Sequence, residues 1–397
     1  MKIRRKIFIV FLMLITIFSV PTTVNADEDK GKIDTNNTSN IDKETLKEID
    51  GLYNYISNIQ NENEILNAIN PKEFIKENMK DGRGDFSIKQ FLPAIKKLFL
   101  KEISSTVKLM LVIIVIGTIC ALLKNLQSAF NNESVCKVAY FACYALFIIV
   151  LSKSFILALD VAKNTISDIT NFMAALIPVL FVLLCSIGGI AQAATMDPIV
   201  LGLVNIVPRI YVDFIIPLIL MVFVLQFINN ICDEYKISKL VKLIKQVAIV
   251  SQGIIMTIFI GILSIRGITA KTLDAVTIKT AKFAIDNFVP IVGKALSDAV
   301  ATVAGYSLVL KSSISTLGLI ILVLMILAPI IKIFLMSIIY KLTGALLEPI
   351  SDGKLVECIT SAGDSLVLIM SCVISISVMC FIMIAIMASA GKFVIGA

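Results

Sequence analysis

Long blocks of hydrophobic residues fill most of this chain, whereas polar residues gather near its amino-terminal end. After residue 102, about seven apolar stretches reach the length of a membrane-spanning helix, at 105–123, 138–159, 172–191, 210–231, 247–265, 316–339 and 365–389. In hydrocarbon each must be helical, because an unpaired backbone amide costs several kcal/mol there. The pattern predicts an all-α fold, a polytopic membrane helix bundle of about seven transmembrane helices over residues 103–397.

The first 26 residues have the pattern of a secretory signal peptide. Basic residues at positions 2–6 precede an apolar run from Ile7 to Phe18, which is shorter than the roughly 20 residues that a spanning helix needs. Small residues then offer a cleavage site between Ala26 and Asp27. An uncleaved membrane anchor is the alternative interpretation.

Residues 27–102 form a polar region that we expect outside the cytoplasm. Its first part, as far as Asn40, is too polar to bury a core. From Ile41 to Ile69 apolar residues recur at helical spacing, and the pattern breaks at Asn70-Pro71 and again near residues 82–84. We therefore expect short amphipathic helices in this region.

Residues 233–246 form an amphipathic segment whose basic face consists of Lys236, Lys239, Lys242 and Lys245. Such a helix can lie in the membrane surface, where its lysines contact anionic lipid. Alternatively, the same residues begin the next spanning helix with a basic end.

Residues 266–315 are too many for a simple loop and carry too many charges for a span that faces lipid. Pro290, Gly293 and Asp298 lie where we expect two helices to meet at a bend. This element would dock on the bundle, on a partner subunit, or dip into the membrane as a re-entrant segment. Gly293 would permit close backbone approach, and Asp298 would need a partner.

The charges of the connecting segments disagree with seven crossings. If the signal peptide leaves residue 27 outside, seven crossings place 266–315 in the cytoplasm and the lysines of 233–246 outside, against the positive-inside rule. Either 233–246 binds the outer membrane surface, or the count of crossings is wrong near residues 198–208 and 283–310.

Arg209 and Asp213 are the most suggestive charged pair within the apolar blocks. They are four residues apart, and therefore lie on one face of a regular helix, where they can pair. As part of a transporter they would form a gate or an ion site. An ion pair at a helix end, at the membrane surface, is the simpler interpretation.

The composition excludes most catalytic chemistry. Hydrophobic residues make up 57% of the chain and charged residues 16%, and there is no histidine for a metal site or a histidine base. The chain has no P-loop, and its eight cysteines include no C-x-x-C pair. The net charge of +7 is spread between apolar blocks, unlike that of a nucleic-acid-binding domain. We expect no enzyme activity, no catalytic residue, no metal and no cofactor.

The order of these parts and one run of residues resemble the stage III sporulation protein AE family of endospore-forming bacteria. The run is Phe288-Val289-Pro290-Ile291-Val292-Gly293, followed by Asp298-Ala299, Thr302-Val303 and Ser307 to Lys311. The resemblance covers the chain from the signal peptide to its carboxyl end.

This resemblance implies a multi-pass protein of the mother-cell membrane around the forespore. It would act with the other membrane proteins of its operon and their ATPase, and indirectly with the forespore stage II protein Q, in a channel or feeding complex. Late forespore gene expression and spore development would depend on it, and self-association as a homo-oligomer would be compatible with that role. A self-contained secondary transporter and a non-conducting scaffold are the alternatives.

Overall fold

The computed structural model describes residues 43–62, 66, 70–81, 88–129, 133–231, 237–288, 293–351 and 353–390. The predicted signal peptide and its cleavage site at Ala26–Asp27 lie outside these residues. Every regular element in the described part is helical: α2 (Lys43–Glu62), α3 (Pro71–Asp81), α4 (Ile88–Ala129), α5 (Glu133–Ser186), α6 (Ile190–Ile210), η3 (Tyr211–Ile215), α7 (Ile216–Ile231), α8 (Ser238–Phe288), α9 (Gly293–Leu347) and α10 (Gly353–Ser389).

The polar region folds into the amphipathic helices that its spacing predicts. Helix α2 buries Leu52 and Ile56 against the bundle. Helix α3 begins at Pro71, where the missing amide of proline costs nothing, and Asn70 caps it because its Oδ1 accepts a hydrogen bond from the Glu73 amide at 3.5 Å. Asn70 Nδ2 also donates to Glu73 Oε2 at 3.1 Å. Helix α4 begins at residue 88 and continues without a break into the first apolar block, so residues 88–102 belong to it.

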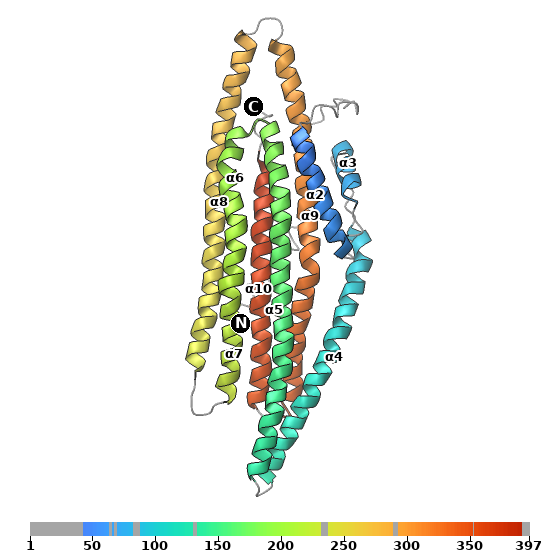
Figure 1. The fold of residues 1–397 in the computed structure, drawn as a ribbon, viewed down its shortest axis with the longest axis vertical. Coiled ribbons are helices and arrows are strands. Elements are labelled where there is room, and N and C mark those ends of the chain that lie inside the picture. The colour runs from blue at the N-terminus through green and yellow to red at the C-terminus, as the bar shows by residue number, and fades with distance from the viewer. Residues whose placement is uncertain are drawn as a thin grey trace. The chain divides into compact units, whose positions relative to one another are not determined.

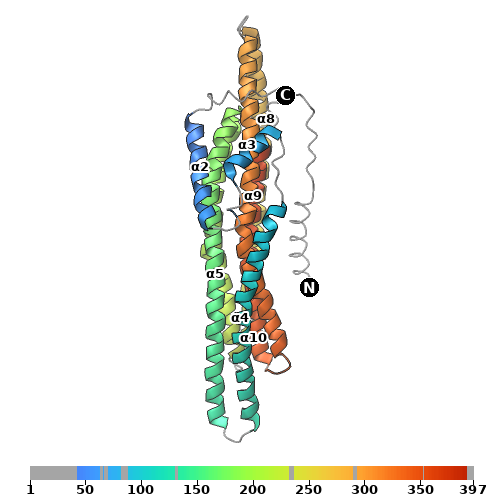
Figure 2. The ribbon, with the colours of Figure 1, turned by 90° about the vertical axis from the view of Figure 1, so that its right-hand side faces the viewer.

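Six helices in the described part of the chain are long and apolar enough to cross a membrane. They are α4, α5, α6 with η3 and α7 as one continuous helix, α8, α9 and α10. These helices run side by side, and the chain changes direction from each one to the next (Figures 1 and 2).

The seven predicted stretches therefore correspond to six helices, because 138–159 and 172–191 do not form two spans. Residues 138–159 of the first stretch and 172–186 of the second both lie in α5, a single helix of 54 residues. At 1.5 Å per residue this helix is about 81 Å long, well over twice the hydrocarbon thickness of a membrane. The polar residues 160–171 between the two stretches include neither proline nor glycine, so nothing breaks the helix there.

Six crossings shift the conflict in the charge distribution to another segment. The carboxyl ends of α4, α7 and α9 lie at one end of the bundle, and α2, α3, the end of α8 and the start of α9 lie towards the other end (Figure 1). The lysines at the start of α8 therefore lie opposite α2 and α3, which suits the positive-inside rule with α2 and α3 outside the cytoplasm, whereas the net-basic segment 266–315 then lies outside, against that rule. The miscounted crossing is in α5, and not at 198–208 or 283–310.

The two predicted amphipathic elements are ends of long helices instead of separate pieces. Lys239, Lys242 and Lys245 lie in the first turns of α8, which runs unbroken from Ser238 to Phe288. The 266–315 segment does consist of two helices, but they are the end of α8 and the start of α9, and they extend past the neighbouring helices (Figure 1). Lys236 and Pro290 lie outside the described residues.

Helix α10 is the most enclosed helix of the bundle. In the most apolar stretch of α10, 61% of the residues are buried. The corresponding value for α9, the next highest, is 44%. It packs against α5, α7, α8 and α9. The fully buried Lys311 of α9 donates from Nζ to the carbonyl of Ala390, where the carbonyls of α10 have run out of helical partners.

Candidate functional site

Polar side chains gather along the face of α10 that meets α7, α8 and α9. We call this group the polar seam; it consists of Gln226, Lys245, Gln252, Ser337, Lys341, Asp364, Ser365 and Ser371. Polar groups inside a membrane bundle are costly and usually have a function, so the seam is the strongest candidate site in the described residues.

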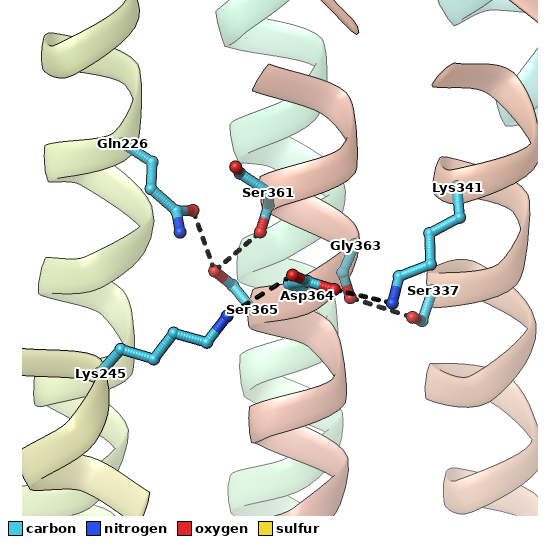
Figure 3. Close-up of polar contacts among 8 residues, drawn as sticks. All are labelled: Gln226, Lys245, Ser337, Lys341, Ser361, Gly363, Asp364 and Ser365. Carbon is cyan, nitrogen blue, oxygen red and sulfur yellow. Dashed lines mark hydrogen bonds and ion pairs between the residues drawn. The ribbon is translucent and has the colours of Figure 1, made fainter. Parts of the chain in front are cut away.

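Asp364 of α10 is the centre of the seam. Its carboxylate lies 2.7 Å from Lys341 Nζ of α9 and 3.5 Å from Lys245 Nζ of α8, so that one carboxylate bridges two ammonium groups (Figure 3). The three side chains are between 28% and 44% exposed. Because these side chains are only partly buried, each pair contributes on the order of 1 kcal/mol.

Two hydrogen bonds beside Asp364 join α10 to α7 and α9. Ser365 Oγ lies 3.2 Å from Gln226 Oε1 and 3.1 Å from the carbonyl of Ser361, and shares its single proton between them. Ser337 Oγ donates to the carbonyl of Gly363 at 2.9 Å (Figure 3). This bond requires α9 and α10 to approach closely, which the missing side chain of Gly363 allows.

A second polar layer lies two helical turns further along α10. Gln252 of α8 is 7% exposed, and its Oε1 accepts a hydrogen bond from Ser371 Oγ at 3.0 Å. Its Nε2 lies 3.5 Å from Cys372 Sγ. Asp364 and Ser371 are seven residues apart, so the two layers are roughly 10 Å apart on one face of α10. The seam thus continues from the lysine end into the interior of the bundle.

Arg209 and Asp213 are not part of the seam. Both side chains are exposed on the outside of the bundle, and the structure records no ion pair between them. They lie in the middle of a continuous helix, on either side of the start of the π-helix η3, instead of at a helix end. The predicted pairing is therefore not formed, although the spacing would allow it.

The other predicted residues also lie away from the seam, with one exception. Gly293 is the first residue of α9 and Asp298 lies in its second turn, but side chains between 266 and 303 are outside the described set. Lys239 and Lys242 are exposed at the start of α8. Only Lys245 enters the seam, where it meets a carboxylate instead of lipid.

Sequence reasoning missed Asp364 and Lys341 because both fell in a segment that we expected to be a loop. The glutamines gave a usable signal, since Gln226 and Gln252 are single amides within long apolar runs. In the part of the chain that the structure describes, no group of three acidic or cysteine side chains comes together as metal ligands. What the seam can do is hold four helices, α7, α8, α9 and α10, in register around a partly exposed charged centre.

Comparisons with known proteins agree with this architecture. A family model described as stage III sporulation protein AE matches residues 69–391. Stage III sporulation protein AE of Bacillus subtilis (strain 168) is 33% identical over 312 residues, which cover 79% of this chain and 78% of that protein. No solved structure matches the chain. Because the family match includes all six long helices, from α4 to α10, the chain belongs to the stage III sporulation protein AE family.

Proposed function

We propose that this protein is a membrane component of the stage III sporulation channel or feeding complex that links the mother cell and the forespore. It would lie in the mother-cell membrane around the forespore and support late forespore gene expression and spore development. Membership of the family supports a role in sporulation. The observation that favours a role within a conducting assembly is the polar seam along α10.

The seam supports this function because burying its polar groups costs free energy, and the packing of the helices alone would not require such groups. Apolar side chains at its positions would hold the helices together without any need to desolvate charge. Instead, α10 carries a partly exposed carboxylate and two serines, which meet polar partners on α7, α8 and α9. In such a place polar groups commonly mark the path of an ion or a polar solute.

The partners that we propose are the other membrane proteins of the stage III operon and their ATPase, with the forespore stage II protein Q as an indirect partner. The chain has no P-loop of its own, so energy for transport would come from that separate ATPase. Neither catalysis nor a cofactor is part of this proposal.

A self-contained secondary transporter is the less favoured alternative. Its predicted gate, Arg209 and Asp213, would need to face the interior of the bundle, and both residues are exposed on the outside. A transporter would instead have to use Asp364. A non-conducting scaffold would need Asp364 only for its contribution to stability.

The test is to replace Asp364 by asparagine, which keeps the shape of the side chain and removes the charge between the two lysines. The matched control is Asp213→Asn, at an exposed carboxylate with no recorded ion pair. We expect Asp364→Asn to reach the membrane and to co-purify with the other complex members, but to block late forespore gene expression. Normal sporulation in Asp364→Asn would contradict a function for the seam.

Electron microscopy of the purified complex then separates the alternatives. We expect α10 and its neighbours to lie beside a continuous path through the assembly. A complex in which this protein binds no other stage III protein would favour the independent transporter, and a solid bundle at the margin of the assembly would favour the scaffold.

A further inference from the structure

Large apolar side chains that remain exposed occupy one limited part of the bundle, which we call the apolar belt. It extends over Leu111–Leu122 of α4, Val138–Leu157 of α5, Ile206–Ile228 of α6, η3 and α7, Leu240–Ile265 of α8, and Phe334–Leu346 of α9 with Ile350 just after that helix. At 1.5 Å per residue it measures about 29 Å on α5 and about 33 Å on α6 and α7. These lengths equal the hydrocarbon thickness of one membrane, roughly 30 Å.

Some described residues depart from this pattern, among them the exposed Arg209 and Asp213 within Ile206–Ile228 and the exposed Lys242 within Leu240–Ile265. Phe99 and Leu100 of α4 stand among lysines, and Val309 of α9 is only 37% exposed. Lys153 of α5 is exposed within the belt, but it is four residues, or about 6 Å, from the edge at Leu157 and can extend its ammonium group to the membrane surface.

The exposed face of α5 becomes polar immediately beyond the belt. Along the same face, the next exposed residues are Asp160, Lys163, Asn164, Ser167, Asp168 and Asn171. The apolar residues of the following turns point the other way: Phe172, Met173 and Leu180 have no exposed surface at all. The stretch 172–186 is therefore apolar because protein surrounds it, and not because lipid does.

Helix α2 packs against this second half of α5. The Tyr55 hydroxyl donates to the carbonyl of Asp168 at 3.4 Å, and its ring stacks on Phe172 with the ring centres 6.5 Å apart. The outer face of α2 is exposed and carries Asp50 and Asn54. A helix with such an outer face cannot lie in hydrocarbon, so water must surround this part of the bundle.

We propose that lipid surrounds this protein only over the apolar belt, and that residues 160–186 of α5 and the start of α6 form an extension of the bundle in water, on the side of the membrane that holds α2. Ser186 would lie about 44 Å beyond the edge of the belt at Leu157, at 1.5 Å per residue. Arg209 would lie near the edge of the belt, about 4.5 Å from Ile206, where charged side chains meet lipid headgroups, and Asp213 would lie about 10 Å from that edge.

The helices would cross the membrane at an incline. Phe155 of α5 stacks directly on Phe223 of α7, with the ring centres 3.6 Å apart, which fixes the relative height of the two helices. Counted along α5 from this contact, the belt ends after two more residues, at Leu157. Along the continuous helix of α7, η3 and α6 it extends from Phe223 to Phe214 and on to Ile206. Its edge is therefore at least 10 Å higher on η3 and α6 than on α5, at about 1.5 Å per residue.

Labelling of single cysteines in the full chain tests this placement, because maleimides react with thiolates in water and not with thiols in hydrocarbon. The informative positions are Ser186→Cys and Asn205→Cys, both exposed and both beyond the belt. Ser167→Cys is the accessible control, and Leu157→Cys is the control within the belt. The reagent is a membrane-impermeant maleimide applied to intact protoplasts.

We expect Ser186→Cys and Asn205→Cys to be labelled as fully as Ser167→Cys, and roughly tenfold more than Leu157→Cys. If α5 instead crossed the membrane twice, both positions would be labelled only after permeabilisation, which would overturn the proposal. No labelling of either position before or after permeabilisation would place them in lipid and would overturn it equally.

A second measurement needs no substitution. The native Cys185 is exposed, whereas Cys120, Cys358, Cys372 and Cys380 are buried. In protoplasts that carry the wild-type chain, peptide mass spectrometry should find the impermeant label on Cys185. Its appearance only in permeabilised cells would contradict an extension in water outside the cytoplasm.

Discussion

Gly363 should accept no residue larger than alanine without a marked loss of stability, because it sets the distance between α9 and α10. A Cβ atom added there would lie 3.2 Å from Lys341 Cγ, 3.3 Å from the carbonyl oxygen of Ser337 and 3.3 Å from Tyr340 Cβ. Ordinary contacts between such atoms are about 3.5–4.0 Å. Two of the three atoms belong to the backbone or adjoin it, so they cannot rotate away, and α9 must retreat.

The magnitudes separate alanine from leucine. For Gly363→Ala, overpacking costs about 1–3 kcal/mol and the gain in helix propensity offsets about 1 kcal/mol, so the net loss is about 0–2 kcal/mol. Gly363→Leu also breaks the 2.9 Å bond from Ser337 and pulls Lys341 from Asp364, each worth about 1 kcal/mol. We expect leucine to cost about 3 kcal/mol or more.

Thermal unfolding of the purified protein in detergent measures the difference. At about 2 °C per kcal/mol for a chain of this size, Gly363→Ala should lower Tm by at most about 4 °C, and Gly363→Leu by about 6 °C or more. The matched controls are Gly261→Ala and Gly261→Leu, where nothing lies within 4 Å of the added Cβ. Equal Tm values for the two leucine variants would refute the argument that close approach at Gly363 holds the seam together.

Three other predictions concern the ends of the bundle. Amino-terminal sequencing of the mature protein should begin at Asp27, and recovery of Met1 would show that the first segment is an anchor. Replacing Lys239 and Lys242 together by glutamine should reduce the anionic lipid that co-purifies, since each exposed lysine near such lipid contributes about 1 kcal/mol; unchanged lipid content would limit them to a role in orientation. Gly293→Leu and Asp298→Leu should reach the membrane but impair sporulation and co-purification of the other complex members, whereas normal results for both would make 266–315 a passive connector.

The helical class and most of the long helices could be predicted from the apolar pattern, because a run of about 20 apolar residues is long enough to span a membrane as a helix. The family was recognised by resemblance, from the order of the parts and the run that begins at Phe288. The number of crossings could not be predicted from the apolar pattern. Apolar residues around a whole helix indicate burial, but they do not distinguish burial in lipid, as at Phe141 and Ile149, from burial in protein, as at Met173 and Leu180. Only the neighbours of α5 make that distinction.

The polar seam was hidden for a different reason. Asp364 and Lys341 are 23 residues apart in the chain, across the turn between α9 and α10, and Lys245 comes from a third helix. Nothing in local spacing brings these residues together. The i+4 spacing of Arg209 and Asp213 makes an ion pair possible but does not require one, and both side chains remain exposed without pairing.

The central place of α10 has a consequence for biosynthesis. This helix leaves the ribosome after every helix that it packs against, so α5, α7, α8 and α9 must enter the membrane while the position between them is still empty. During that interval Gln226, Gln252 and Lys341 lack the partners that α10 later supplies. The nascent bundle must therefore stay open on one side, exposed to lipid, water or a chaperone. Ribosome-stalled chains that stop before residue 353 should be the form most readily captured by membrane insertion factors and most readily degraded.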